Sequence, residues 1–292
     1  MNTPTSSASA INSKLRLFEI YNKTKYLSIK HDSYFQVYEQ VFSPYVGKNI
    51  TFVEIGVLNG GSLHMWREYF GPSARIIGID LNPGAKKWED SGFEIFIGSQ
   101  SDPIFWDDFY QKVGPVDIVL DDGGHTNLQQ IITTHKAIPY IKDGGVLIIE
   151  DVHTSYFKDF GNPSKYSFVN FAKHMVDTIN SRFPAVKVVK NDYGKKVFSI
   201  TFYESIVVFA IDSRRCFTSS PTSNDGITAD AEDFRLKGTA QSVVVKTQHI
   251  LFEKLSFLRC IPFAKTVAQK FFDSTQWLLA RKQTQQAKSF FD

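Results

Sequence analysis

A chain of 292 residues with 42% hydrophobic content is long enough for one sizeable α/β domain with extensions. Its formal net charge of +3 at pH 7 is only mildly basic, so the composition does not indicate nucleic acid as a partner, and none is predicted. The two cysteines, Cys216 and Cys260, exclude a disulfide framework and a zinc-ligand spacing, and we expect a reducing, cytoplasmic location.

The chain begins with a polar stretch that gives no sign of a targeting segment. Residues 1–14 are rich in Ser and Thr and lack an apolar run, which predicts disorder and no secretory signal. No later stretch reaches the roughly 18 apolar residues that a membrane-spanning helix needs, so we expect a soluble protein. Apolar residues at three- and four-residue spacing then predict an N-terminal helical cap over 15–48.

Short apolar runs alternate with amphipathic segments over residues 49–212. Two final runs, 197–203 and 205–211, lie so close together that only a tight hairpin can join them. The preceding runs predict buried strands separated mostly by helices, at 50–55, 75–80, 93–98, 116–122 and 145–151. This pattern is typical of a Rossmann-like α/β fold with helices on both faces of the sheet. We predict a mostly parallel, seven-stranded sheet that ends in an antiparallel hairpin, as class I methyltransferases do.

The C-terminal part has a different composition. Residues 213–240 are polar and turn-rich, which predicts a loop or linker, and 241–292 predict basic amphipathic helices interrupted by Pro262. Such helices either lie on an anionic membrane surface, at the inner face of the membrane, or pack on the core or in a homo-oligomer contact. The residues of this pattern are Leu251, Leu255, Leu258, Phe263, Val267, Phe271, Trp277 and Leu278, with Lys254, Arg259, Lys265, Lys270, Arg281 and Lys282 among them.

A glycine-rich loop follows the first predicted strand. It runs from Glu54 through Gly56 and Gly60 to Ser62, where a helix begins. Its glycine spacing, G-x-x-x-G-G, differs from the G-x-G-x-x-G of dinucleotide folds and suits a ligand that carries a carboxylate and an amine. We expect Glu54 to orient the amino group. Asp80, at the end of the second strand, is placed to accept hydrogen bonds from the ribose hydroxyls of an adenosine moiety.

Acidic residues end two strands that we expect to be neighbours. Asp121 and Asp122 end the fourth strand, and Glu150 and Asp151 end the fifth. Helix capping or solvation would explain the first pair alone, but clustered carboxylates repel one another unless a cation lies between them. A hard divalent ion, Mg²⁺ or alternatively Mn²⁺, satisfies Asp122, Glu150 and Asp151. His125 follows closely and is the candidate general base.

Several motifs together resemble the metal-dependent sugar O-methyltransferases, which act on deoxysugars of macrolide- and anthracycline-type natural products and have relatives in bacterial polysaccharide gene clusters. The resemblance spans roughly residues 30–212. It rests on HDSYFQVYEQVFSPY, VEIGVLNGGSLHMWREYFG, IGIDLNP, GSQSDPIFW, VDIVLDDGGH and EDVHTSY. One departure is Gly124, where the sugar enzymes often have serine.

The resemblance also implies roles for individual residues. It places metal ligands at Asp122, Glu150 and Asp151, and the catalytic histidine at His125. Tyr156 matches a position near the substrate pocket and is the next candidate for the base. The implied contacts with S-adenosylmethionine (SAM) are Glu54, Gly56, Asp80, Gln100, Ser101 and Asp102, with Asp121 beside its reactive end.

The function that follows is SAM-dependent, metal-assisted methylation of a sugar hydroxyl, on a polysaccharide glycan or a glycosylated natural product. The metal would chelate two neighbouring oxygens and lower the pKa of one hydroxyl, whose proton His125 removes. A catechol-like or other non-sugar hydroxyl is an alternative acceptor, and a degenerate scaffold is the alternative of another class. The missing G-x-G-x-x-G disfavours a dehydrogenase, and the sequence shows no two-histidine, one-carboxylate set that would support a hydroxylase.

Overall fold

A computed structural model of the chain describes residues 11–161, 164–184, 186 and 192–227, together with scattered positions between 242 and 291. The chain divides into two units, Met1–Pro221 and Thr222–Asp292. Among the described residues, no helix is both long and apolar enough to cross a membrane. Most of the predicted C-terminal pattern, including Leu251, Leu255, Leu258, Phe263, Val267, Phe271 and Leu278, lies outside the described residues.

The first unit contains a seven-stranded sheet in the order β3-β2-β1-β4-β5-β7-β6. Strands β1 to β5 pair in parallel, and β7 pairs antiparallel with both β5 and β6, which confirms the predicted fold. The strands are β1 (Thr51–Ile55), β2 (Arg75–Asp80), β3 (Glu94–Ile97), β4 (Val116–Asp121), β5 (Ile141–Ile149), β6 (Val197–Tyr203) and β7 (Ile206–Ile211).

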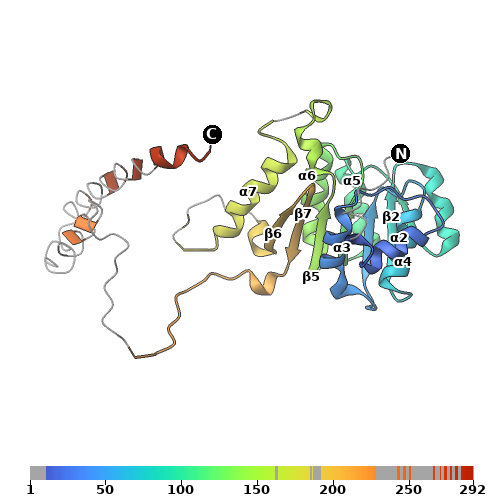
Figure 1. Cartoon of the computed structure of the whole chain (residues 1–292), viewed down its shortest axis with the longest axis horizontal. Coiled ribbons are helices and arrows are strands. Elements are labelled where there is room, and N and C mark those ends of the chain that lie inside the picture. The colour runs from blue at the N-terminus through green and yellow to red at the C-terminus, as the bar shows by residue number, and fades with distance from the viewer. Residues whose placement is uncertain are drawn as a thin grey trace. The chain divides into compact units, whose positions relative to one another are not determined.

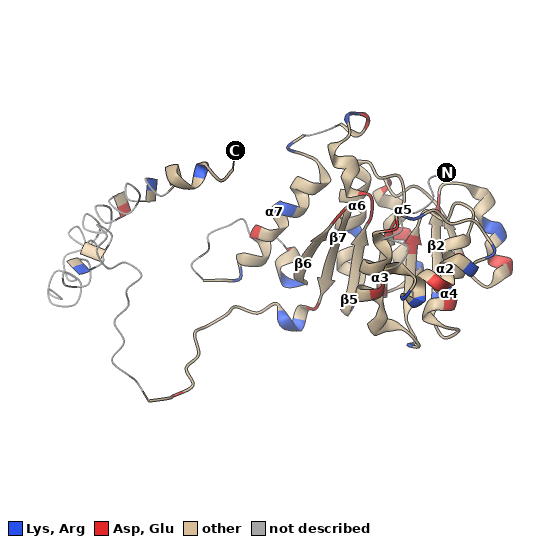
Figure 2. Cartoon of the chain, viewed as in Figure 1, with Lys and Arg blue, Asp and Glu red and all other residues tan. Residues whose placement is uncertain are grey.

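Helices cover both faces of this sheet (Figure 1). They are α2 (Arg16–Lys23), α3 (Tyr34–Phe42), α4 (Gly61–Phe70), α5 (Pro103–Val113), α6 (Asn127–Ala137) and α7 (Phe168–Asn180). Short 3₁₀ turns are η1 (Ser43–Tyr45), η2 (Pro83–Ser91), η3 (Ile138–Tyr140), η4 (Val152–Tyr156), η5 (Lys158–Phe160), η6 (Asp192–Lys195) and η7 (Ser213–Arg215). Figure 2 shows Lys and Arg interspersed with Asp and Glu over the helices around the sheet.

The alternation of side chains along each strand sorts the apolar residues into two cores. On β1, Phe52 belongs to the core shared with α2, α3 and α4, whereas Val53 belongs to the core shared with α5, α6 and α7. On β4, Leu120 points to the first core and Val119 to the second. A polar residue at a strand end therefore faces the helix layer that its place in this alternation dictates.

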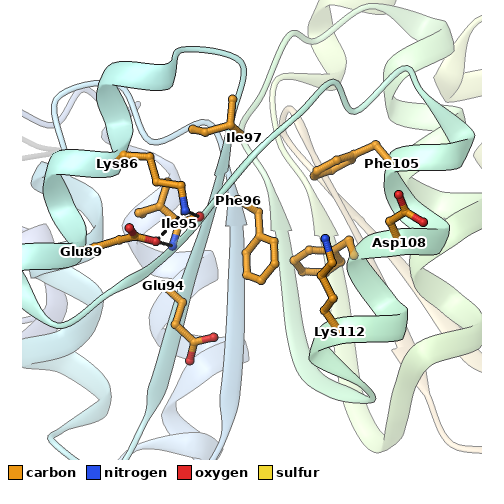
Figure 3. Close-up of a pocket in the computed structure, with 10 residues that line it drawn as sticks. Lys86, Glu89, Glu94, Ile95, Phe96, Ile97, Phe105, Asp108 and Lys112 are labelled. Atoms are coloured by element: carbon orange, nitrogen blue, oxygen red, sulfur yellow. Dashed lines mark hydrogen bonds and ion pairs between the residues drawn. The ribbon is translucent and has the colours of Figure 1, made fainter.

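Strand β3 lies at one edge of the sheet, where side chains cover its backbone groups (Figure 3). Lys86 Nζ donates to the carbonyl of Ile95 at 2.6 Å and to Glu89 Oε1 at 2.7 Å. The amide of Ile95 donates to the same Glu89 oxygen at 3.3 Å. These contacts occupy the backbone N–H and C=O of Ile95, which would otherwise be free to pair with another strand. A cavity of about 510 Å³ beside β3 contains none of the predicted site residues.

Candidate functional site

A cavity of about 610 Å³ lies at the carboxyl ends of β1, β2 and β4. Strand order reverses between β1 and β4, and ligands of open α/β sheets bind in the crevice at such a point. The cavity joins the glycine loop to the acidic strand ends. The predicted residues that line it are Gly56, Asp80, Gln100, Asp122, His125 and Asp151.

Glycine is required at two positions of the loop. Gly56 has φ +91°, and a Cβ there would lie 2.1 Å from the carbonyl oxygen of Asp122. Gly60 has φ +72°, and its Cβ would lie 2.3 Å from the indole of Trp88. The loop can therefore pass close to the end of β4 and lead into α4, whose amino-terminal amides face a ligand placed in the loop.

Asp80 ties the end of β2 to the glycine loop. Its Oδ2 accepts from the amides of Val57 at 2.8 Å and Leu58 at 3.1 Å, and its Oδ1 accepts from the amide of Asn82 at 2.8 Å. A carboxylate has about four acceptor sites, so this side chain can take a further donor from the cavity. The predicted contact with ribose hydroxyls fits this position.

Glu54 and Ser62 lie beneath the loop rather than along the cavity. Glu54 Oε2 accepts from Ser62 Oγ at 2.7 Å, and Oε1 accepts from Trp66 Nε1 at 3.0 Å. Burial raises the pKa of Glu54 to about 7. These contacts brace the loop from within the core, and the predicted role of Glu54 toward an amino group stays a prediction.

Sequence reasoning missed Lys30, which lies among the predicted carboxylates. Its Nζ is 2.6 Å from Asp122 Oδ2, 3.1 Å from Glu150 Oε2 and 3.8 Å from Glu54 Oε1, and its side chain is 1% exposed. Burial alone would lower the pKa of Lys30, but Asp122, Glu150 and Glu54 together raise it above its ordinary value. Part of the positive charge that the acidic cluster requires is thus built into the chain.

Glu150 is turned away from the cavity. Tyr38 of α3 donates to its Oε1 at 2.5 Å, and Lys30 holds Oε2. Burial raises the pKa of this carboxyl well above its usual range, although the charge of Lys30 opposes the shift. Glu150 can join a metal site only by giving up these partners, so its predicted role as a ligand stays a prediction.

Asp122, His125 and Asp151 come together in the cavity. Their ligand atoms lie within 4.8 Å of one another, and His125 Nε2 is 3.4 Å from Asp151 Oδ2. Among the described residues, no group bonds His125 Nδ1, although that atom is buried. His125 and Asp151 have φ +57° and +54°, a left-handed conformation that non-glycine residues rarely adopt. Two carboxylates fit a hard divalent cation, with an imidazole beside them that can serve as a base.

The other predicted cofactor residues shape the loops around the cavity. Asp121 is buried, which raises its pKa, and it accepts from Gln100 Nε2 at 3.0 and 3.1 Å. Gln100 Oε1 accepts from the amide of Gly124 at 2.7 Å. Asp102 caps α5 by accepting from the amide of Ile104 at 2.9 Å, and the amide of Ser101 donates to Ser99 Oγ at 3.2 Å.

Two further results concern the loop after β5. Tyr156 lies in η4 with 60% of its surface exposed and does not line the cavity, so its predicted catalytic role gains no support from the geometry. No sequence pattern indicates a two-histidine, one-carboxylate set, but the structure brings these residue types together. His31 and His153 lie around Asp151, with their ligand atoms within 4.8 Å of one another.

Comparison with known proteins supports the resemblance seen in the sequence. No protein-family model matches the chain. The 8-demethyl-8-alpha-L-rhamnosyl tetracenomycin-C 2'-O-methyltransferase of Streptomyces olivaceus is 32% identical over 171 residues, which cover 53% of this chain and 45% of that protein. The demethylmacrocin O-methyltransferase of Streptomyces fradiae is 30% identical, with coverage of 49% and 38%. The chain thus spans less than half the length of these relatives.

A solved structure shows the same fold. The MycE methyltransferase from the mycinamycin biosynthetic pathway, in complex with Mg, SAH and mycinamycin VI, superposes with a TM-score of 0.61 at 22% identity. The alignment covers 84% of this chain and 60% of MycE. At this identity the likeness concerns the fold.

Replacing Lys30 by methionine should destabilise the fold, because Glu54, Asp122 and Glu150 would lose their buried counterion. We expect Lys30→Met to lower the free energy of unfolding by about 3–5 kcal/mol. Mg²⁺ should then stabilise the variant more than the wild type, because no ammonium competes for the carboxylates. Urea unfolding with MgCl₂ and with NaCl of equal ionic strength measures both effects.

Lys195→Met is the matched control for this prediction. Lys195 forms an exposed pair with Asp192, so its loss should cost less than about 1 kcal/mol. If Mg²⁺ raised the free energy of unfolding equally in the wild type and in Lys30→Met, Lys30 would not occupy a cation position.

The raised pKa of Glu54 predicts a pH dependence of stability. The folded chain keeps this proton up to about pH 7, whereas the unfolded chain releases it near its ordinary value of 4.5. The fold binds more protons between these values, so its stability falls as the pH rises through this window. Relative to the wild type, Glu54→Gln should gain about 2–3 kcal/mol between about pH 5 and pH 8.

Denaturant unfolding of both proteins at the two pH values tests this, with exposed Glu68→Gln on α4 as the control. If the difference in unfolding free energy between the wild type and Glu54→Gln did not change with pH, Glu54 would already be ionised in the folded chain.

Proposed function

We propose that this chain, whose relatives are sugar O-methyltransferases and whose fold is that of class I methyltransferases, transfers a methyl group from SAM to a sugar hydroxyl with the help of a divalent cation. One observation carries the proposal. A single cavity joins the glycine loop and Asp80 to Asp122, His125 and Asp151. Cofactor binding and proton removal can therefore take place within one cavity.

The cofactor end of the cavity fits an adenosyl amino acid. Asp80 would hold the ribose hydroxyls, and Gly56 would allow close approach of the loop. Gln100 lines the cavity and holds Asp121 and the amide of Gly124 in place. SAM supplies an electrophilic methyl group, and these residues would hold it in line with the acceptor oxygen.

At the other end, Asp122 and Asp151 would hold the cation, which we propose to be Mg²⁺, and Glu150 could join them only after leaving Lys30 and Tyr38. A bound cation lowers the pKa of a hydroxyl that it contacts. His125 would take the proton of the acceptor hydroxyl. Its Nε2 lies 3.4 Å from Asp151 Oδ2, so the carboxylate would stabilise the imidazolium that forms.

The acceptor is proposed to be a sugar with two adjacent oxygens. The name of the Streptomyces olivaceus relative gives a rhamnosyl tetracenomycin as its methyl acceptor. A vicinal diol offers two oxygens to one cation and fits a carboxylate-rich site. A glycan of a bacterial polysaccharide belongs to the same class of acceptor and is included in the proposal.

Asp80→Asn should weaken SAM binding by about 1–3 kcal/mol, since an amide cannot accept as the carboxylate does and leaves donors unpaired. Isothermal titration calorimetry with SAM measures this loss. The control is Asp107→Asn, an exposed residue of α5 that pairs with Lys136. Unchanged SAM affinity in Asp80→Asn would reject the assignment of the ribose site.

His125→Asn should lower methyl transfer by about 10²–10⁴-fold with SAM binding intact, the usual contribution of a positioned base. Asparagine tolerates the left-handed φ of +57° at this position, so the backbone should be preserved. The assay follows labelled methyl transfer from SAM to glycan and glycosylated acceptors. EDTA should abolish turnover and Mg²⁺ should restore it.

His174→Asn, at an exposed position of α7, is the control and should keep full activity. Full activity in chelator would exclude the cation from the reaction. A loss of less than about tenfold in His125→Asn would move the base to another residue.

A further inference from the structure

Asp151 presents its two carboxylate oxygens to two different sets of side chains. Oδ2 faces the cavity, 3.4 Å from His125 Nε2. Oδ1 faces the other way, 3.8 Å from His31 Nε2 and 3.9 Å from His153 Nδ1. The cavity residues therefore contact only Oδ2 of this carboxylate, whereas Oδ1 faces two histidines outside the cavity.

The outer set is held in place by its surroundings. Lys30, the neighbour of His31 in the chain, is anchored to Asp122 and Glu150, which fixes where His31 emerges. The rings of His31 and His153 lie 5.6 Å apart and nearly perpendicular. His31 is 63% exposed and His153 36%, so solvent ions reach both rings.

Hydrogen bonds hold both the backbone and the carboxylate of Asp151. Asp151 has φ +54°, and its carbonyl accepts from the amide of Thr154 at 3.0 Å and from Thr154 Oγ1 at 2.8 Å. Tyr34 donates to Oδ1 at 2.5 Å and lies 2.8 Å from Ser205 Oγ, which in turn contacts His153 Nδ1. These contacts hold Asp151 Oδ1 and His153 Nδ1 near one another, and the hydroxyls of Tyr34 and Ser205 would turn away from the two atoms when an ion binds them.

We propose that His31, Asp151 and His153 form a second divalent-cation site, which takes ions that bind imidazole, such as Zn²⁺, Co²⁺, Ni²⁺ or Fe²⁺. Two imidazoles and one carboxylate favour these ions over Mg²⁺, which prefers oxygen ligands. Ligands of a tetrahedral ion at about 2.0–2.2 Å lie roughly 3.4 Å apart. The 3.8 and 3.9 Å separations therefore need to close by only about half an ångström.

This site is separate from the carboxylate-rich set in the cavity. The cavity set uses Oδ2 with Asp122 and His125, whereas the outer set uses Oδ1, and a bridging carboxylate can bind one ion at each oxygen. Three protein ligands leave a position open for water or for an oxygen of a bound molecule. The proposal of the outer site does not rest on the proposed methyl transfer.

The test uses Co²⁺ as the probe, with the full chain free of any histidine tag and in saturating Mg²⁺ to fill the cavity set. Wild-type protein should bind one Co²⁺ per chain and develop the visible absorption of cobalt bound to nitrogen. His31→Gln and His153→Gln should each weaken Co²⁺ binding by roughly tenfold or more. Circular dichroism and unfolding midpoints confirm that the variants fold.

Two further variants make the outcome decisive. His174→Gln removes an exposed histidine beside Asp177 and should leave Co²⁺ binding unchanged. Asp122→Asn disables the cavity set and should also retain the cobalt spectrum. The proposal is overturned if Co²⁺ does not bind in excess Mg²⁺, if both His→Gln variants bind it normally, or if Asp122→Asn abolishes binding. Loss of methyl transfer in Asp122→Asn with the cobalt spectrum intact would separate the two sites.

Discussion

The site depends on one electrostatic constraint, which is that three carboxylates at neighbouring strand ends share a single buried lysine. Glu54, Asp122 and Glu150 come from β1 and from the ends of β4 and β5, and the alternation of side chains turns them toward the layer of α2, α3 and α4. Lys30 Nζ contacts all three within 3.8 Å. Burying like charges together is tolerable only with a counterion, and removing it would be far more costly than replacing the whole cluster. The segment before α3 is therefore an essential part of the strand-end chemistry, although it lies outside the sheet.

This arrangement couples cation binding at Asp122 to the position of Lys30. Asp122 is shared, because Lys30 holds its Oδ2 while 22% of its side chain remains exposed and the residue lines the cavity. A divalent ion at Asp122 would compete with the ammonium or displace it. Burial raises the pKa values of Glu54 and Glu150, and the charge of Lys30 opposes both shifts. Cation affinity should then depend on the position of Lys30.

The sequence predicted most of the features that arise from strand periodicity, and missed those that arise from docking of the N-terminal segment. Neighbouring parallel strands end at one edge, which is why Asp122, His125 and Asp151 gather in the cavity with Asp80 and Gly56. Strand alternation could also have shown that Asp121 faces α6 and that Glu150 faces α3. No local pattern predicts that Lys30, Tyr34 and Tyr38 reach these acids, since a tertiary contact brings them there. A turn assigned by resemblance, Ser101 and Asp102, serves to start α5.

Backbone strain is concentrated around the same edge of the sheet. Leu58, His125, Asp151 and Ser205 all have φ between +45° and +61°, and each lies in the cavity or contacts a group that surrounds Asp151. Such conformations cost about 1–3 kcal/mol each and persist when the surroundings require an exact side-chain direction. At Asp151 that direction divides the two oxygens between His125 on one side and His31 with His153 on the other. The cavity set is carried by β4 and the loops that follow β4 and β5, whereas the outer histidines belong to the N-terminal segment and η4. Changes in the outer histidines can therefore alter which ion binds there without altering the cavity in which the methyl transfer is proposed to occur.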